Sequence, residues 1–181
     1  ETIADLGSQR EKEDKEAMKE LGITPENNIY LRFGDGKLEN NQELIAALVL
    51  QIRTFKPDII ITHNPESVII RFINGDSWIN HRDHRNTGQS TIDAAYPFSR
   101  DMNFFPDQFT DPMVESHLVK EFLIVDYYDH PDMVYIDVSD FTETRVKAHA
   151  KHLSQYSQSA AQEAADYFTI RPGFPQGRRF E

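Results

Sequence analysis

The sequence has 181 residues, of which 39% are hydrophobic and 27% charged, and a formal net charge of −11 at pH 7. This size predicts one globular domain spanning residues 1–181, and no apolar run approaches the ~20 residues that cross a bilayer. The negative charge argues against nucleic acid or an anionic membrane as partner, and favours a neutral or cationic small-molecule substrate. Because cysteine is absent, disulfides, redox CxxC pairs and thiolate metal sites are excluded, and any metal must be bound by His, Asp or Glu.

The sequence begins at Glu1 rather than at a methionine. The first residues have neither the basic start nor the apolar stretch of a signal peptide. The sequence therefore does not show whether targeting information lies upstream of Glu1. The cytoplasmic location that we expect is a default, because it rests on the lack of visible targeting and of cysteine.

Helices and strands are predicted to alternate along the first part of the chain. In order, the pattern indicates a helix at 9–22 capped by Ser8, a strand at 28–33, a turn at 34–36, a helix at 41–55 and a buried parallel strand at 59–62. The strand at 28–33 is predicted from alternating apolar and polar residues, whereas that at 59–62 is a continuous apolar run, as buried parallel strands are.

The same rhythm continues to the end of the chain. It predicts a helix from 84 to about 96, a Pro- and Phe-rich loop to about 112, strands at 122–127 and 133–138, and helices at 141–156 and 160–167. Such alternation indicates an α/β fold with a Rossmann-like, doubly wound and mostly parallel sheet. Nothing before Gln9 has the pattern of the strand that opens such a sheet, so we expect the first βα unit to be missing from these residues.

The densest cluster of possible ligands is Asn80-His81-Arg82-Asp83-His84, which runs directly into a predicted helix. His81 and His84 are three residues apart, so both can face one cavity, where one binds a metal and the other donates to a substrate oxygen. Asp83 between them can fix the tautomer of an imidazole ring. The same spacing also occurs by chance in solvated loops, so spacing alone does not decide between the two interpretations.

The other histidines are weaker candidates. His63 comes directly after a predicted strand, where a histidine is more often packed or hydrogen-bonded than bound to a metal. His130-Pro131-Asp132 is typical of a turn. His149 and His152 lie on a predicted helix, where an exposed or interhelical position is the ordinary one, and the sequence assigns no role to His117.

On these residues and several further motifs, the chain resembles the LmbE-like, PIG-L-type family of N-acetylglucosaminyl deacetylases. The resemblance covers nearly the whole chain. It rests on Arg10-x-x-Glu13-x-x-x-Ala17, Leu21-Gly22-Ile23, Gly34-Asp35-Gly36-Lys37-Leu38, Lys56-Pro57-Asp58 with 59–63, His81-x-Asp83-His84-Arg85-x-x-Gly88, Ala95-Tyr96-Pro97-Phe98-Ser99-Arg100-Asp101 with Phe105-Pro106, His130-Pro131-Asp132 with 136–138, and Lys147 with His152-x-Ser154-Gln155. The order of these motifs is more specific than any one of them.

The resemblance implies a role for each matching residue. His84 would be a zinc ligand, His81 would stabilise the oxyanion or protonate the leaving amine, and Asp83 would orient His81. Arg10 and Asp35 would bind sugar hydroxyls. In this family the other zinc ligands and the general base come from an HPDD-type motif, which we expect upstream of Glu1. Where the family usually has proline this chain has Arg82, whose side chain we expect to point to solvent.

The expected function is zinc-dependent removal of an acetyl group from an N-acetylglucosamine-type substrate, which releases acetate and a free amine. Two alternatives stay open. One is a metal-free relative that binds a sugar or a partner, and the other is a zinc amidase that acts on a non-sugar acyl amide. The sequence does not decide between a monomer and a homo-oligomer.

Overall fold

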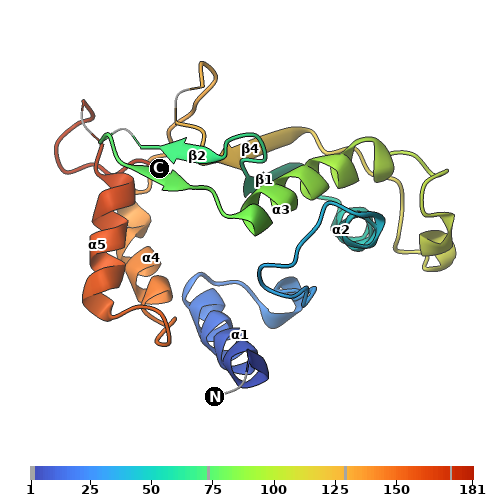
Figure 1. The fold of residues 1–181 in the computed structure, drawn as a ribbon, viewed down its shortest axis with the longest axis horizontal. Coiled ribbons are helices and arrows are strands. Elements are labelled where there is room, and N and C mark those ends of the chain that lie inside the picture. Colours follow the sequence, from blue (N-terminus) through green and yellow to red (C-terminus); the bar gives the residue numbers. More distant parts are fainter. Residues whose placement is uncertain (1–2, 73, 129, 172) are drawn as a thin grey trace. The chain divides into compact units, whose positions relative to one another are not determined.

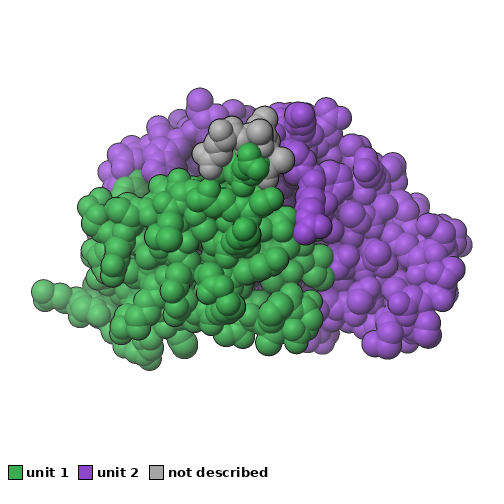
Figure 2. Space-filling view, turned by 90° about the horizontal axis from the view of Figure 1, so that it is seen from below, with its two compact units in different colours: residues 1–30, 134–181 green, residues 31–133 purple. Residues whose placement is uncertain are grey.

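The structure is a computed structural model that describes residues 3–72, 74–128, 130–171 and 173–181. Its helices and strands lie along the chain in the order α1 (Ile3–Glu20), α2 (Gln42–Phe55), β1 (Ile59–His63), β2 (Ile69–Arg71), β3 (Ser77–Ile79), α3 (Arg82–Asp93), β4 (Glu121–Val125), α4 (Thr142–His149) and α5 (Gln158–Thr169) (Figure 1). The chain divides into two compact units, which Figure 2 colours separately: unit 1 is residues 1–30 and 134–181, and unit 2 is residues 31–133. Each unit has a hydrophobic cluster of its own, and the single domain stays a prediction.

Unit 2 is built on a parallel pair of strands. β1 pairs with β4 in a register that places Ile60 opposite Phe122. Both side chains pack against a core formed by α2, by the π-helical turn Ala94–Phe98 and by the segment before β4. The buried members of this core are Ile45, Val49, Ile52, Ala94, Ala95 and Val119. The predicted parallel α/β arrangement is therefore confirmed.

A short antiparallel hairpin interrupts unit 2, and the sequence did not predict it. β2 and β3 pair with Ile69 opposite Ile79. Gly75, with φ +92°, makes the turn between them, and its N–H donates to the carbonyl of Phe72 over 3.0 Å. The strands have three residues each, which is too short for a period-two pattern to stand out in the sequence.

Several predicted boundaries are wrong. Residues 28–33 form no strand, because Arg32 adopts a left-handed conformation, φ 56°, that a β-ladder does not accept. Residues 133–138 form only an isolated bridge, between Asp137 and Phe180. α1 begins before Ser8, which therefore lies inside the helix instead of capping it.

Unit 1 is a helical unit in which α4 contacts both α1 and α5. The small side chains of Ala161 and Ala165 are fully buried and pack with Val146. The predicted helix at 141–156 ends at His149, because the chain then turns to bring Ser154 against α1. Within the described residues of both units, no helix is long and apolar enough to cross a membrane.

A buried carboxylate joins α1 to that turn. Glu13 is only 8% exposed. It accepts hydrogen bonds from the backbone N–H of Ser154 at 2.9 Å, from its hydroxyl at 2.7 Å, and from the Gln9 side chain at 3.0 Å. The hydrogen bond from the Ser154 hydroxyl is the largest of the effects that lower the pKa of Glu13, against the opposing effect of burial.

This contact predicts a pH-dependent contribution to stability. Because the folded-state pKa of Glu13 is lowered, its carboxylate stabilises unit 1 above the unfolded-state pKa, and the contribution is lost as pH falls through the folded pKa, below the ordinary value of 4.5. We expect Glu13→Gln to unfold at lower urea concentration than the wild type at neutral pH, with the difference shrinking in acid. Glu16→Gln is the matched control, since Glu16 is exposed and pairs with Lys19. A difference that is constant with pH would contradict the assignment.

Candidate functional site

The candidate site lies where β1, β4 and α3 meet in unit 2. β1 ends at His63 and β4 ends at Val125, so the two parallel strands end at the same edge. α3 begins at Arg82, has His81 as its N-cap and contacts β1. In open α/β sheets, ligands bind at the carboxyl ends of the strands. The predicted cluster at 80–84 therefore lies at the edge where a ligand site is expected.

Gly88 allows α3 to come this close to β1. A Cβ atom at this position would lie 2.2 Å from the carbonyl oxygen of His63 and 3.2 Å from the backbone nitrogen of Pro65. The neighbouring atoms belong to the backbone, so they cannot rotate away. The glycine in the sequence motif therefore has a steric reason: the helix passes directly over the chain that leaves β1.

We expect Gly88→Ala to lower the free energy of unfolding by about 1–3 kcal/mol, because the added methyl group forces α3 and β1 apart. Gly7→Ala is the matched control. Gly7 also lies within a helix, but a Cβ there meets nothing within 4 Å, and alanine is favoured over glycine in a helix by roughly 0.5–1 kcal/mol. Urea unfolding of the two variants measures the difference. Equal stability of Gly88→Ala and the wild type would mean that the close approach is not needed.

Three histidines gather at this edge. The rings of His63 and His84 are stacked, with centroids 4.2 Å apart and planes 9° from parallel. His81 lies beside them, 5.6 Å from His84 between centroids. On the other side of His63, its Nδ1 is 3.9 Å from a carboxylate oxygen of Asp126. The structure thus places His63 with the two predicted site histidines, although its sequence position alone made it a weaker candidate.

The surroundings of His84 favour its neutral form. Desolvation of the packed side of the ring lowers the pKa of His84, and the neighbouring His63 and His81 lower this pKa further. Asp126 and Asp83 oppose the shift but do not reverse it. The residue is nevertheless accessible on its open side. A neutral, accessible imidazole is the form that binds a metal ion.

The tautomer of His81 is determined by its place at the start of α3. Its Nδ1 accepts a hydrogen bond from the backbone N–H of Asp83 at 3.2 Å. Nδ1 must therefore carry a lone pair, so the ring proton of the neutral form sits on Nε2. His81 is exposed, so Nε2–H can donate to a bound ligand.

The Asp83 carboxylate contacts the predicted turn at 34–36. Its Oδ2 accepts a hydrogen bond from the backbone N–H of Gly36 at 2.5 Å, while Arg82 donates to the carbonyl of the same residue at 3.2 Å and to Glu39 at 3.2 Å. Asp83 therefore contacts His81 through its backbone rather than its carboxylate. Arg82, predicted to point to solvent, is exposed and also bridges to the turn. These contacts hold the exposed Asp35 beside the start of α3.

Arg10, the other predicted sugar-binding residue, lies exposed on α1 in unit 1. It belongs to the unit that does not contain the histidine cluster. Its role in substrate binding stays a prediction, as does that of Asp35.

Three buried polar atoms at the site have no hydrogen-bond partner among the described residues. They are Nδ1 of His63, Oδ1 of Asn80 and Oδ1 of Asp83. Asn80 is 2% exposed, and its amide group already donates to the carbonyls of Asn64 and Ser67. Buried polar atoms in native proteins nearly always have a partner, which can be water or an ion. Three such atoms at one edge therefore support a binding site there for an ion, a ligand or water.

The donors at this edge fit part of a zinc site. Imidazole nitrogen and carboxylate oxygen are zinc ligands, and a catalytic zinc takes about three of them from the protein. The described part of the chain brings together no group of three or more side chains that could hold a metal by themselves. His84 is the residue best prepared to contribute, because it is both neutral and accessible.

Asn64 is a supporting residue that the sequence pattern did not reveal. It is fully buried. Its side-chain oxygen accepts from the backbone N–H of Glu66 and Ser67, and its amide donates to the carbonyl of Asp126 at 3.2 Å. It therefore ties the end of β1 to the end of β4. The only signal in the sequence was an Asn-Pro pair after a strand, which predicts a turn and no more.

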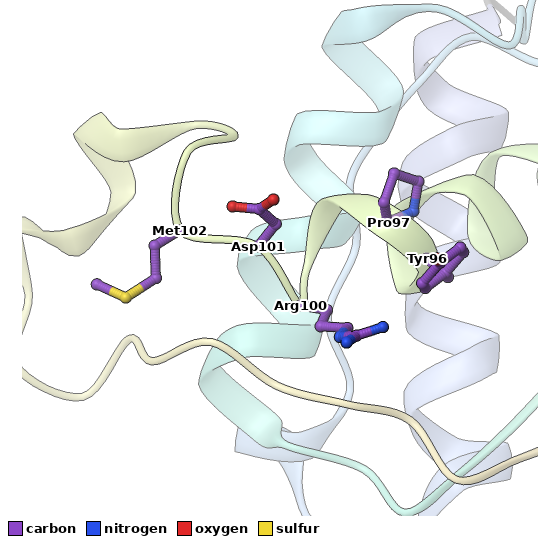
Figure 3. Close-up of a pocket in the computed structure, with 5 residues that line it drawn as sticks. All are labelled: Tyr96, Pro97, Arg100, Asp101 and Met102. Atoms are coloured by element: carbon purple, nitrogen blue, oxygen red, sulfur yellow. The ribbon is translucent and has the colours of Figure 1, made fainter.

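A separate hollow of about 540 Å³ lies beyond the other end of α3. It is lined by Tyr96, Pro97, Arg100, Asp101 and Met102 (Figure 3). The figure shows Arg100 turned toward Tyr96, whereas Asp101 and Met102 point elsewhere. The side chains do not converge on one point, and none of the histidines is among them. We therefore place the functional site at the histidine cluster.

Comparisons with known proteins relate this chain to de-N-acetylases. A family model described as GlcNAc-PI de-N-acetylase, PIG-L, matches residues 1–95, more than half of the chain. The diacetylchitobiose deacetylase of Thermococcus kodakarensis is 27% identical over 158 residues, which are 85% of this chain and 52% of that protein. The chain thus spans about half the length of this curated relative.

Two solved structures share the fold. The N,N'-diacetylchitobiose deacetylase of Pyrococcus horikoshii, solved with an inhibitor, has a TM-score of 0.71 and 24% identity over 98% of this chain and 65% of that one. A conserved protein of Thermus thermophilus has a TM-score of 0.64 and 20% identity over 88% of this chain and 64% of that one. At these identities the likeness concerns the fold, and it confirms the predicted Rossmann-like α/β class. On the match to its family model, the chain belongs to the PIG-L family of GlcNAc-PI de-N-acetylases.

Proposed function

We propose that the protein is a zinc-dependent hydrolase that removes the acetyl group from an N-acetylglucosamine-type substrate. The observation that carries the proposal is the histidine cluster at the strand ends, in a chain of a de-N-acetylase family. His84 is neutral and accessible, His81 presents an Nε2–H group, and three buried polar atoms lack partners beside them among the described residues.

His84 and His81 would have different roles in the reaction. A bound zinc ion would act as a Lewis acid toward a water molecule and the amide carbonyl. His84 would be one of its ligands, through a ring nitrogen that is unprotonated at neutral pH. His81 would donate Nε2–H to the oxygen that becomes negatively charged when the amide is attacked. Because the position of that N–H is fixed by the N-cap bond, little reorganisation is needed during the reaction.

Substrate positioning is assigned to the turn at 34–36. Asp83 and Arg82 hold Gly36 by its N–H and its carbonyl, and this fixes Asp35 one residue away. A carboxylate at the mouth of the site can accept hydrogen bonds from sugar hydroxyls. Arg10 is proposed as a second contact to the sugar. The name of the curated relative supports an N-acetylated sugar as the substrate class.

Two measurements on the intact gene product test the proposal. The first is zinc per chain by elemental analysis after dialysis without chelator. The second is release of acetate from N-acetylglucosamine oligomers and conjugates, compared with release of acid from longer acyl amides that carry no sugar. We expect about one zinc per chain, as one catalytic ion requires, with activity on the acetylated sugars. His84→Ala is the negative control for zinc.

The other possible outcomes decide between the alternatives. Zinc together with activity only on non-sugar amides would identify a zinc amidase and overturn the sugar assignment. No zinc, even after it is supplied, together with sugar binding and no turnover, would identify a metal-free binding protein.

A further inference from the structure

The way the ring of His63 lies against that of His84 limits what His63 can do. Their rings are stacked with planes 9° from parallel and centroids 4.2 Å apart. A ligating nitrogen points at its metal along the plane of the ring, at about 2.0–2.1 Å for zinc. In two stacked, nearly parallel rings these in-plane directions run in separate planes and do not converge on one point. The two rings cannot bind the same ion in this arrangement, so His63 needs another role.

His63 lies between α3 and Asp126, the residue that follows β4. Its carbonyl oxygen is covered by α3 at Gly88. Its Nδ1 faces the Asp126 carboxylate at 3.9 Å. Asp126 is itself held in a left-handed conformation, φ 67°, and its carbonyl accepts a hydrogen bond from the buried Asn64. Non-glycine residues in this conformation are uncommon and cluster at functional sites.

His84 has no comparable support of its own. It lies in the first turn of α3, is exposed, and its ring forms no hydrogen bond with the described part of the chain. An exposed imidazole in a first helical turn changes rotamer on the picosecond to nanosecond timescale unless something packs against it. The ring of His63 is what packs against its face.

We propose that His63 is a positioning residue, which holds the ring of His84 in one orientation by stacking on it. This inference rests on the proposed role of His84 as a zinc ligand, but the stacking can be tested without metal. Residues that orient a metal ligand typically contribute about 10–100-fold to metal affinity. His63 would contribute through packing, without a hydrogen bond to His84.

Three variants of the intact protein separate the effects. His63→Ala removes the stacked ring, and His63→Phe keeps a flat ring but loses the contact with Asp126. His130→Ala is the matched control, because it removes a half-exposed histidine from a turn in the same unit. Each variant is measured for zinc affinity by competition with a chelator, for ring mobility of His84 by NMR relaxation in metal-free protein, and for melting temperature.

We expect His63→Ala to weaken zinc binding about 10–100-fold and to make the His84 ring mobile, with a melting temperature close to that of His130→Ala. His63→Phe should recover most of the affinity and the order of the ring. Unchanged zinc affinity and an unchanged His84 ring in His63→Ala would overturn the proposal. So would a loss of affinity that accompanies a lower melting temperature and is not recovered in His63→Phe, because it would show a general structural role.

Failure of the proposed function is distinguishable from failure of this inference. If the wild type binds no zinc, the deacetylase proposal falls, and the relaxation measurement alone decides the positioning role. A His84 ring that becomes mobile only in His63→Ala then supports the role, and a ring that is equally ordered in all variants overturns it.

Discussion

Replacing His81 with alanine is expected to lower kcat for deacetylation by about 10²–10⁴-fold, the usual contribution of a general acid, with little loss of zinc. The reason is the Nε2–H group, which is fixed by the hydrogen bond between Nδ1 and the backbone N–H of Asp83. Removing one donor from an oxyanion site alone costs about 10²–10³-fold. Because the missing hydrogen bond is formed mainly in the transition state, KM should change far less than kcat.

His81 also caps α3, so the alanine variant loses two things at once. Loss of an N-cap costs about 0.5–2 kcal/mol of stability, and asparagine is among the best cap residues. His81→Asn therefore keeps an acceptor for the Asp83 N–H but lacks a donor at the position of Nε2. We expect His81→Asn to recover the stability of the wild type and to remain slow.

The comparison of the two variants determines the role of His81. If His81→Asn recovered kcat as well as stability, the residue would act only as a helix cap. If His81→Ala turned over normally, His81 would have no part in the mechanism. Steady-state kinetics and urea unfolding of the same protein samples give both answers.

The parallel pair β1 and β4 and the helices between them were predictable from the sequence, because a bounded apolar run and helical spacing are local patterns. The same patterns placed residues 80–84 at the start of a helix, in agreement with the structure. The stacking of His63 on His84 was not predictable in this way. It depends on how closely α3 approaches β1, and that distance is set by Gly88, 25 positions after His63 in the sequence.

The two strands that were predicted wrongly failed for the same reason. The segment at 28–33 has the side-chain alternation of a strand and that at 133–138 is largely apolar, but a strand also needs a partner along its length. Arg32 turns the first segment away from an extended path, and the second pairs with the C-terminal segment over residues 136–138, which is too short a contact for a strand. A local residue pattern shows which side chains a segment could bury, whereas strand pairing depends on distant parts of the chain.

No local sequence pattern predicted the burial of Arg53. In the sequence it is a cation near the end of a helix, where such residues are usually solvated. In the structure it is 0% exposed. Its guanidinium donates to the carbonyls of Phe98, Ser99, Asp101, Phe104 and Phe105 and to the side chain of Gln108. Burial lowers the pKa of Arg53, while Asp101 and Asp107 oppose the shift.

These contacts organise the predicted loop after α3. Residues 98–108 contain no strand and no α-helix. Five of their backbone carbonyls point at one guanidinium, whose planar fork can serve several acceptors at once, and three of these, in Ser99, Asp101 and Phe105, also accept from a backbone N–H. The ring of Phe109 covers the group at 4.4 Å from its central carbon. One side chain of α2 thus joins several turns of the loop, in addition to the loop's own backbone hydrogen bonds.

Arg53→Met is expected to lower the free energy of unfolding by about 3–5 kcal/mol, since removing one partner from a buried charged network leaves its acceptors with fewer hydrogen bonds. Methionine fills a similar volume, so the loss reports the missing donors rather than a cavity. Arg53→Lys should recover only part of the stability, because an ammonium group has three donors and no planar fork. Arg100→Met is the matched control: Arg100 is exposed in the same loop, and its loss should cost less than about 0.5 kcal/mol. If urea unfolding gave Arg53→Met the stability of Arg100→Met, the loop would be held by its apolar contacts instead, chiefly those of Phe98 and Phe105 with the core of unit 2.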